Sequence, residues 1–443
     1  MDVSSAITIA ISILGFILIL GFIGNYIFNR TQVPSIVWLL IFGLIVGFIF
    51  NIKVIDSGLI DYISGFFSSV AIVIILFDGG INIDLHQLFR GAPRGLLLTV
   101  TGFCLSILAT MGIMIGLSVS NVLNIDVQTS VIIGIVLGSI IGGTSSPIVI
   151  PLASRLTNLE NRTKMILSIE SILTDPLAIV VFLALFFMIK SGEPDIGVGV
   201  IRLVSTFSVG TVVGIATGGI WLPIMHHIRK EQFSYVVTLA IAFLMFSLTD
   251  SWWNGAGAIS CLMFGLVLGN GKKILKMVDY HGKGFEMDDQ TKQYHALISF
   301  VMRTFFFVFL GMMVTYQEVK IEFIIIGIII LLALLGLRYL AVMITTLKGN
   351  FERDDRQSMS VMMPRGLAAA ILAITYGPKL VESSLPSLSG FYEGIVFVII
   401  LGTAIICTTG VSLICHRQHK PIEKRETSID LKEEIDLMSK KEK

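Results

Sequence analysis

The sequence predicts an all-α, polytopic membrane protein with about thirteen transmembrane helices. Of its 443 residues, 54% are hydrophobic and only 14% are charged, whereas soluble domains are about a quarter charged. Apolar stretches of about 20 residues, the length that spans the hydrocarbon core of a bilayer, recur along most of the chain. Most of the protein is therefore expected to lie inside a membrane.

The individual spans follow from windows of high mean hydropathy. They cover residues 5–28, 34–50, 60–82, 95–120, 128–154, 164–190, 197–224, 233–252, 255–270, 293–316, 320–347, 358–380 and 390–416. Together they form one transmembrane domain, residues 1–417, followed by a short charged tail at residues 418–443.

Basic residues in the loops predict the orientation of these spans. Alternate loops hold sixteen Lys and Arg residues, and the intervening loops hold four. Loops rich in Lys and Arg stay on the cytoplasmic side. The N-terminus is therefore expected outside the cell membrane and the tail in the cytoplasm, which requires an odd number of spans and fits thirteen.

Two spans are interrupted by Gly and Pro. The fifth contains GGTSSP at residues 142–147, and the twelfth contains PRG at residues 364–366. Lipid cannot satisfy the backbone groups that a break exposes, so breaks occur where they line a cavity. If residues 197–224 are a linker helix, residues 1–190 and 232–417 form two six-helix halves with the breaks in matching places. The linker inverts the second half, and inverted repeats with broken helices are typical of secondary transporters.

The sixth span carries two carboxylates, Glu170 and Asp175, at a depth where an unpaired charge is costly. Their separation of five residues turns them to different sides of a helix, so different partners are expected. Pro176 breaks the hydrogen-bond ladder next to Asp175. Burial favours the protonated form of a carboxylate, and a nearby cation favours the ionised form. Asp175 is thus predicted to hold either a proton or a metal ion; the alternative is a structural pairing.

Hydroxyl groups surround this predicted site. Thr174 and Ser171 lie next to Asp175 along the sixth span, and the broken fifth span offers Thr144, Ser145 and Ser146. Hydroxyl and freed carbonyl oxygens are hard ligands, suited to Na⁺ or K⁺ by the same logic that suits them to Ca²⁺. Such residues also serve in helix packing, but their place at the break favours cation binding.

Four further charged residues within the apolar spans are candidates for roles near the site: Arg303, Arg338, Arg365 and Asp78. Arg338 needs a partner, and Glu170 is the expected one, in a structural ion pair. Arg303 is expected either near Asp175 or as an interfacial side chain that reaches the cytoplasmic surface. Arg365, at the second break, is expected to neutralise half-helix ends or to bind lipid head groups. Asp78 is expected either to line an inner funnel that attracts cations or to end a helix.

Other classes of function find little support. The four cysteines show no metal-ligand spacing, no nucleophile or phosphate-binding motif is present, and a net charge of +1 gives no reason to expect nucleic acid. The chain is therefore expected to be neither an enzyme nor dependent on a cofactor. A cation channel is the main rival, but channels usually place their pore on a symmetry axis. Here the polar residues gather at two breaks within one chain.

The chain resembles the monovalent cation–proton antiporter family, in its NhaP-type sodium/proton exchanger branch, over residues 30–410. The resemblance is carried by six segments in the family's order: ILFDGGINIDL, IGGTSSPIVIP, SIESILTDPLAIVVF, FFFVFLG, LRYLAV and MPRGLAAAIL. It implies a thirteen-helix, NhaA-like fold and a homodimer whose six-helix core moves like an elevator.

The resemblance also implies roles for single residues. Asp175 matches the essential aspartate, Glu170 and Arg338 match a glutamate–arginine pair, and Ser171 matches a serine near the ion. This sequence departs from the family at three sites. Thr174 replaces an asparagine, Ser145-Ser146-Pro147 replaces Thr-Asp-Pro, and Arg303 replaces a glutamate of the animal members.

The resulting expectation is an antiporter that exchanges cytoplasmic Na⁺ (or Li⁺) for external H⁺ across the cell membrane. The same mechanism with K⁺ is the alternative. The three departures leave the choice between Na⁺ and K⁺ open, as well as the choice between electroneutral and electrogenic exchange.

Overall fold

The structure is a computed structural model that describes residues 3–31, 33–49, 57–83, 93–123, 125–156, 159–190, 196–228, 233–271, 274, 289–316, 319–347, 349–382 and 388–418. These residues form fifteen helices and no strand. The helices are α1 (Val3–Thr31), α2 (Ser35–Ile49), α3 (Ser57–Asn82), α5 (Pro93–Val119), α6 (Val127–Ile141), α7 (Ser146–Arg155), α8 (Asn161–Lys190), α9 (Ile196–Ile228), α10 (Ser234–Trp252), α11 (Ala256–Gly269), α13 (Asp289–Tyr316), α14 (Ile321–Thr346), α15 (Arg353–Val361), α16 (Leu367–Glu382) and α17 (Phe391–Gln418). The predicted all-α class is confirmed.

Most of these helices are suited to a bilayer. Eight described helices are long and apolar enough to cross a membrane, and the bent pair α6–α7 makes a ninth. Four shorter apolar helices coincide with further predicted spans: Leu14–Phe28, Ser35–Ile49, Ala256–Gly269 and Leu367–Leu380. The chain is thus a multi-pass membrane protein. The count of thirteen and the inverted repeat stay predictions, and residues 419–443 of the predicted tail lie outside the described residues.

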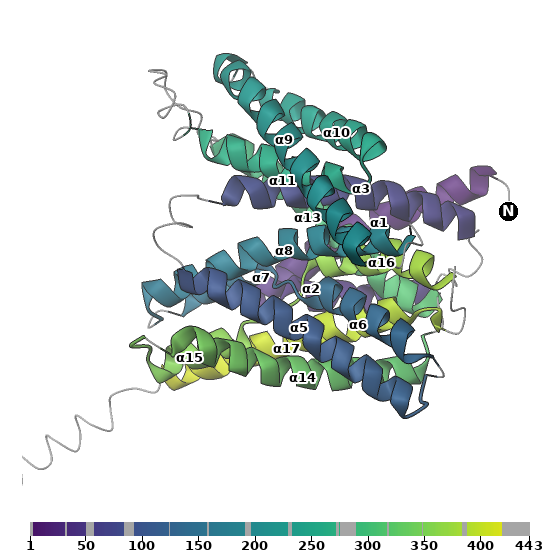
Figure 1. The fold of residues 1–443 in the computed structure, drawn as a ribbon, viewed down its shortest axis with the longest axis vertical. Coiled ribbons are helices and arrows are strands. Elements are labelled where there is room, and N and C mark those ends of the chain that lie inside the picture. Colours follow the sequence, from purple (N-terminus) through teal and green to yellow (C-terminus); the bar gives the residue numbers. More distant parts are fainter. Residues whose placement is uncertain are drawn as a thin grey trace, which may run out of the picture.

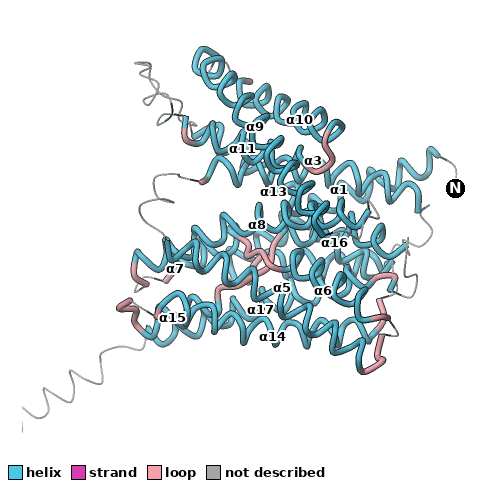
Figure 2. Tube along the Cα trace, viewed as in Figure 1, coloured by secondary structure: helices cyan, strands magenta, loops and turns pink. Residues whose placement is uncertain are grey.

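Both predicted breaks contain non-helical residues, although the last two residues of the first one, Ser146 and Pro147, already belong to a helix. Helices α6 and α7 meet at an angle of 47°, across residues 142–145. Residues 362–366 separate α15 from α16. Figure 2 shows loop segments at the centre of the molecule, between the helices. The half-helix α15 starts earlier than the predicted span at 358, because Glu352 and Asp355 form a capping box at its N-terminus.

Helix α8 is central to the arrangement. It contacts α3, α5, α6, α7 and α16. In Figure 1, α9, α10 and α11 lie toward one end of the molecule with α3, while α5, α14 and α17 lie toward the other end. The middle of α8 is therefore held between two groups of apolar helices.

Glycines bring two helix pairs into backbone contact. A Cβ atom on Gly43 of α2 would lie 2.9 Å from the Cα of Gly311 in α13, and the reverse distance is the same. A Cβ on Gly80 of α3 would lie 2.7 Å from the backbone nitrogen of Leu266 in α11. Small residues allow this close approach, which drives helix association where lipid supplies no hydrophobic force. These contacts, α2 on α13 and α3 on α11, are here termed the glycine seams.

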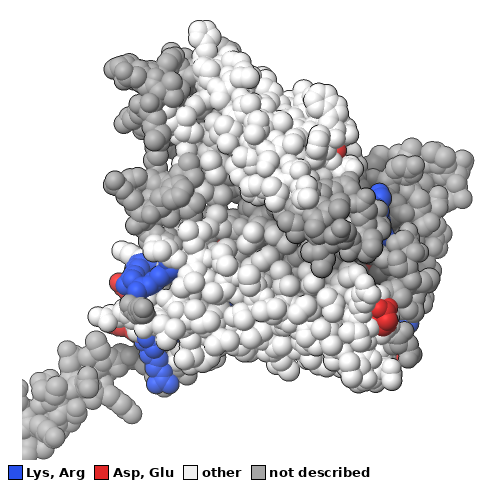
Figure 3. All heavy atoms as spheres, in the orientation of Figure 1, with Lys and Arg blue, Asp and Glu red and all other residues white. Residues whose placement is uncertain are grey.

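The visible surface is mostly uncharged. In Figure 3, Lys and Arg side chains gather at one edge of the molecule, around α15, and few charges interrupt the wide face beside it. This pattern matches a protein whose sides contact lipid and whose end contacts head groups and water.

Candidate functional site

A small cavity lies beside the middle of α8, where the broken helix α6–α7 meets α3 and α13. Its volume is about 60 Å³, enough for an ion with a few waters, since one water needs about 10–15 Å³ on this measure. Five of the residues predicted for the site line it: Asp78, Ser145, Ser146, Asp175 and Arg303. The cavity thus joins groups that lie more than 200 residues apart in the chain.

Asp175 forms one wall of this cavity, followed by Pro176. Its carboxylate lies directly against the break in the fifth span. A Cβ atom placed on Gly143 would be 3.2 Å from Asp175 Oδ1 and 3.2 Å from the carbonyl oxygen of Thr174. Only a glycine lets the α6–α7 backbone approach the carboxylate this closely without displacing it.

Ser145 and Ser146 start the half-helix α7 at the cavity. Ser145 occupies the N-cap position, but its side chain makes no capping hydrogen bond. Its backbone N–H instead donates to the carbonyl oxygen of Pro364, at 2.8 Å. The first break is therefore bonded to the second one, and the Ser145 hydroxyl is left at the cavity wall.

Arg365 binds the end of the other half-helix. Its Nη1 donates to the carbonyl oxygens of Gly142 and Gly143, at 2.9 and 3.0 Å. Its own backbone N–H donates to Thr403 Oγ1 of α17, at 3.0 Å. Arg365 is 5% exposed and lies at the C-terminal end of α6, where the helix dipole is negative. The arginine therefore supplies the charge and donors that this buried helix end lacks.

Thr174 ties α8 to the first break. Its Oγ1 accepts a hydrogen bond from the backbone N–H of Thr144 at 2.9 Å and lies 3.0 Å from Thr144 Oγ1. Both residues are buried. Ser171 differs, because its hydroxyl donates to the carbonyl oxygen of Ser168 in its own helix, at 3.1 Å. Of these three predicted ligands, none is among the cavity-lining residues.

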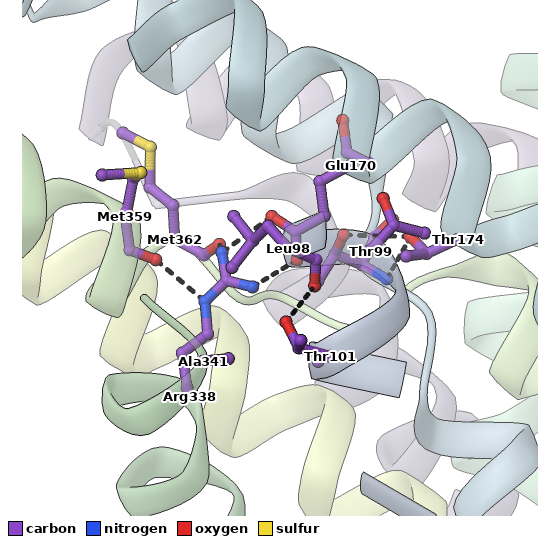
Figure 4. A network of polar contacts seen from close by, with 12 residues as sticks. Leu98, Thr99, Thr101, Glu170, Thr174, Arg338, Ala341, Met359 and Met362 are labelled. Atoms are coloured by element: carbon purple, nitrogen blue, oxygen red, sulfur yellow. Dashed lines mark hydrogen bonds and ion pairs between the residues drawn. The ribbon is translucent and has the colours of Figure 1, made fainter. Parts of the chain in front are cut away.

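Glu170 and Arg338 meet on the far side of α8 from the cavity. The two side chains form a two-pronged ion pair, with Arg338 Nη2 2.8 Å from Glu170 Oε2 and Nη1 bonded to Oε1 (Figure 4). Arg338 also donates to the carbonyl oxygens of Met359 and Met362, at 2.8 and 3.1 Å. The pair therefore joins α8 to α14 and to the end of α15, ahead of the second break.

Asp78 and Arg303 face the cavity from α3 and α13. Two further polar side chains that line the cavity were not among the predicted ones, Asn82 and Ser299. Asn82 Nδ2 donates to Asp78 Oδ1, at 2.8 Å. Each of the two lies four residues from a predicted charge on the same helix, Asn82 from Asp78 and Ser299 from Arg303. That spacing places them on one helix face and is the signal that would have identified them.

Two crossed, broken helices beside a membrane-embedded carboxylate define the class of secondary transporters, in which ion sites lie at such breaks. Comparison with known proteins is more specific. A family profile described as "Sodium/hydrogen exchanger, transmembrane" matches residues 15–417. The chain belongs to this family.

Several relatives carry names of cation–proton antiporters or exchangers. Na(+)/H(+) antiporter 1 of Methanocaldococcus jannaschii is 27% identical over 410 residues, which is 90% of each chain. Sodium/hydrogen exchanger 8 of Arabidopsis thaliana is 26% identical over 58% of this chain and 34% of its own length. K(+)/H(+) antiporter NhaP2 of Shewanella sp. is 26% identical over 47% of this chain and 35% of its own length.

The fold has a solved counterpart. The structure of the sodium proton antiporter MjNhaP1 from Methanocaldococcus jannaschii at pH 8 superimposes with a TM-score of 0.71 and 23% sequence identity. The superposition covers 92% of this chain and 96% of the other. The fold of this chain is therefore the fold of that antiporter.

Proposed function

We propose that this protein is a secondary antiporter that exchanges monovalent cations for protons across the cell membrane, with Asp175 as the shared binding group. The observation that carries the proposal is the cavity in which Asp175 lies between the Ser145–Ser146 break and the Asp78–Arg303 wall. Keeping an unpaired carboxylate ionised in a small, mostly apolar site costs free energy. It is neutralised either by a proton or by a cation, and this competition couples the two fluxes.

The residues around Asp175 are proposed to have different roles. Ser145 and Ser146 offer hydroxyl oxygens at the cavity, which suit a hard cation. Thr144, Thr174 and Arg365 are proposed to position the break next to Asp175 through their hydrogen bonds. Glu170 and Arg338 act as a structural strut. Ser171 is proposed to support the α8 backbone next to Asp175.

Asp78 and Arg303 are proposed to set the charge of the cavity. The two groups attract each other across it, so the positive guanidinium does not repel an arriving cation at full strength. Asp78 attracts cations toward the cavity, while Arg303, which lines the same cavity, is proposed to compensate negative charge there in one state of the cycle.

Na⁺ (or Li⁺) is the proposed cation, and K⁺ is the second candidate. The name of the relative matched along 90% of its length specifies Na⁺, whereas the Shewanella relatives matched over 35% of theirs are named for K⁺. The presence of serines in place of a carboxylate at the break is compatible with either ion.

The transport cycle is proposed to follow the family resemblance. The chain forms a homodimer, its N-terminus lies outside and its C-terminus in the cytoplasm, and a core that contains α8 moves as a unit. Support for a unit movement comes from the direct bonds among α6, α7, α8, α16 and α17 around the breaks.

The test is cation-induced proton movement in energised inverted membrane vesicles, with Na⁺, Li⁺ and K⁺ added separately. Asp175→Asn should abolish the response. Asp126→Asn is the matched control, because the Asp126 carboxylate only caps α6, by accepting from the Thr129 N–H at 2.9 Å. A response to K⁺ alone would assign the protein to the second candidate. Transport retained by Asp175→Asn would remove Asp175 from the mechanism.

Competition itself has a pH signature. If one carboxylate binds either ion, the apparent KM for the cation should rise about tenfold for each pH unit below the pKa of the site and be flat above it. A maximal rate that changes with pH at constant KM would contradict a shared site.

A further inference from the structure

A second site lies at the surface, at the end of the molecule where basic side chains gather. A groove of about 690 Å³ opens between α14, α15 and α17. The short helix α15 lines one part of the groove, here termed its upper part, and the spans α14 and α17 line the other, here termed its lower part. The three helices lie together on the side away from α9 and α10 (Figure 1). Nothing in the proposed exchange mechanism uses this groove.

The upper part of the groove is polar and cationic. It is lined by Arg353, Arg356, Gln357 and Ser360. Their spacing of three, four and seven residues places them on one face of α15. The opposite face is buried and carries Asp355, which accepts from the backbone N–H of Glu160. Among the described residues, no carboxylate lies within ion-pair distance of either arginine.

The lower part of the groove is apolar and open to the surroundings of the protein. Tyr339 and Met343 of α14 are 59% and 45% exposed, and Leu413 of α17 is 62% exposed. Both helices are membrane-spanning candidates. Tyr339 lies seven residues before the end of α14 at Thr346, about 10 Å along the helix axis. Because α14 and α17 are membrane-spanning candidates, the groove is expected to extend from the head-group region into the hydrocarbon region.

We infer that this groove binds an anionic phospholipid, with its phosphate on Arg353 and Arg356 and an acyl chain against Met343 and Leu413. Arginine recognises phosphate through paired, charge-assisted hydrogen bonds. Basic pockets at the ends of membrane helices bind anionic head groups. The apolar floor selects a lipid over a soluble anion, because lipid chains necessarily cover surface at that depth.

The position of the groove gives the lipid a structural consequence. Ser360 and Val361 line it from outside, and the neighbouring carbonyls of Met359 and Met362 hold Arg338 on the inside. A lipid that clamps α15 onto α14 and α17 therefore stabilises the strut on which the second break depends.

The experiment uses the full chain, delipidated in an uncharged detergent and titrated with phosphatidylglycerol or phosphatidylcholine. Bound lipid is counted by native mass spectrometry, and thermal unfolding is followed in parallel. Wild type should retain phosphatidylglycerol in preference and unfold at a higher temperature with it. Arg353→Gln/Arg356→Gln should weaken that binding about 30-fold, and Arg353→Lys/Arg356→Lys should keep part of it.

The matched control is Arg30→Gln/Arg155→Gln, which removes two exposed charges that stack on Tyr26 and Phe28 instead of lining the groove. It should bind phosphatidylglycerol as wild type does. Three results would each overturn the inference: equal retention of phosphatidylcholine, unchanged binding in the glutamine double variant, or displacement of the lipid by millimolar inorganic phosphate. Because the readout is binding, a failure of the proposed exchange would leave this test intact.

Discussion

The backbone N–H of Ser145 donates a 2.8 Å hydrogen bond to the carbonyl oxygen of Pro364. This single bond joins the break in α6–α7 to the break before α16, although more than 200 residues separate them. A Cβ atom on Gly366 would lie 2.8 Å from the Cβ of Ser145, so the two segments also touch. The two breaks thus provide hydrogen-bond partners for each other's backbone groups, which lipid could not satisfy.

Gly366→Ala tests this contact. The added methyl group cannot fit without moving Ser145 and should lower stability by about 1–3 kcal/mol. It should also lower the rate of cation–proton exchange, because Ser145 lines the cavity. Thermal unfolding and initial transport rates would be measured beside Gly112→Ala, whose Cβ would meet no atom within 4 Å. Equal behaviour of the two variants would show that the contact has no consequence.

Thr174→Val removes one hydroxyl at nearly constant volume. The backbone N–H of Thr144 then loses its acceptor inside the protein, which costs about 1–3 kcal/mol. The apparent KM for the cation should rise, since the break next to Asp175 is no longer fixed. Thr409→Val is the control, because the Thr409 hydroxyl bonds only within its own helix and is exposed. An unchanged KM in Thr174→Val would separate Thr174 from the site.

The Glu170–Arg338 pair should respond unequally to its two single substitutions. Glu170→Gln leaves the bonds from Arg338 to Met359 and Met362, whereas Arg338→Met removes these bonds and leaves Glu170 buried alone. Breaking a buried pair typically costs about 3–5 kcal/mol. Arg338→Met should therefore yield less folded protein in gel filtration, and the double variant should recover part of it.

Charge reversal at both positions provides a second check on the strut. It should restore the ion pair but not the bonds to the two carbonyls, so recovery should be incomplete. Full recovery would mean that the bonds to Met359 and Met362 contribute little. A total lack of recovery would indicate that the pair does not act as a unit.

Arg365→Lys keeps the positive charge but removes the planar guanidinium group with its paired N–H donors. A lysine cannot reproduce the paired bonds to Gly142 and Gly143 together with the orientation of the guanidinium. Exchange should fall by up to about 100-fold, as expected when a positioned group is displaced by about 1 Å, while the protein stays folded. Arg155→Lys, at an exposed helix end, should transport normally. Wild-type rates in Arg365→Lys would reduce the role of Arg365 to its charge alone.

The broad fold was predictable because membrane insertion leaves strong marks in a sequence. Long apolar runs located the helices, and Gly and Pro inside them located both breaks. The start of α15 was missed because its first residues are polar, and their capping box is local chemistry that hydropathy does not detect. The number of membrane crossings stays a prediction, since four apolar helices are shorter than a full span.

The site was predictable by residue type and less so by contact. Buried charges in lipid are few, so Glu170, Asp175, Arg338 and Arg365 were identifiable from their positions alone. Their partners depend on how distant helices meet. The two carbonyls that hold Arg338, and the hydroxyl of Thr403 behind Arg365, have no signal in the sequence. Ser171 was expected near the ion, and this role stays a prediction; its hydroxyl donates to the carbonyl oxygen of Ser168.

The glycine seams predict that glycines in apolar helices of this protein differ sharply in how well they tolerate substitution by alanine. Gly43, Gly80 and Gly311 stand where a single methyl group meets backbone, which cannot rearrange as a side chain does. Gly15 and Gly336, in equally apolar helices, would meet no atom within 4 Å. A saturation screen should therefore reject alanine at the first three positions and accept it at the other two. Hydropathy treats all five alike, so such a screen would map the helix contacts of this protein without any structure.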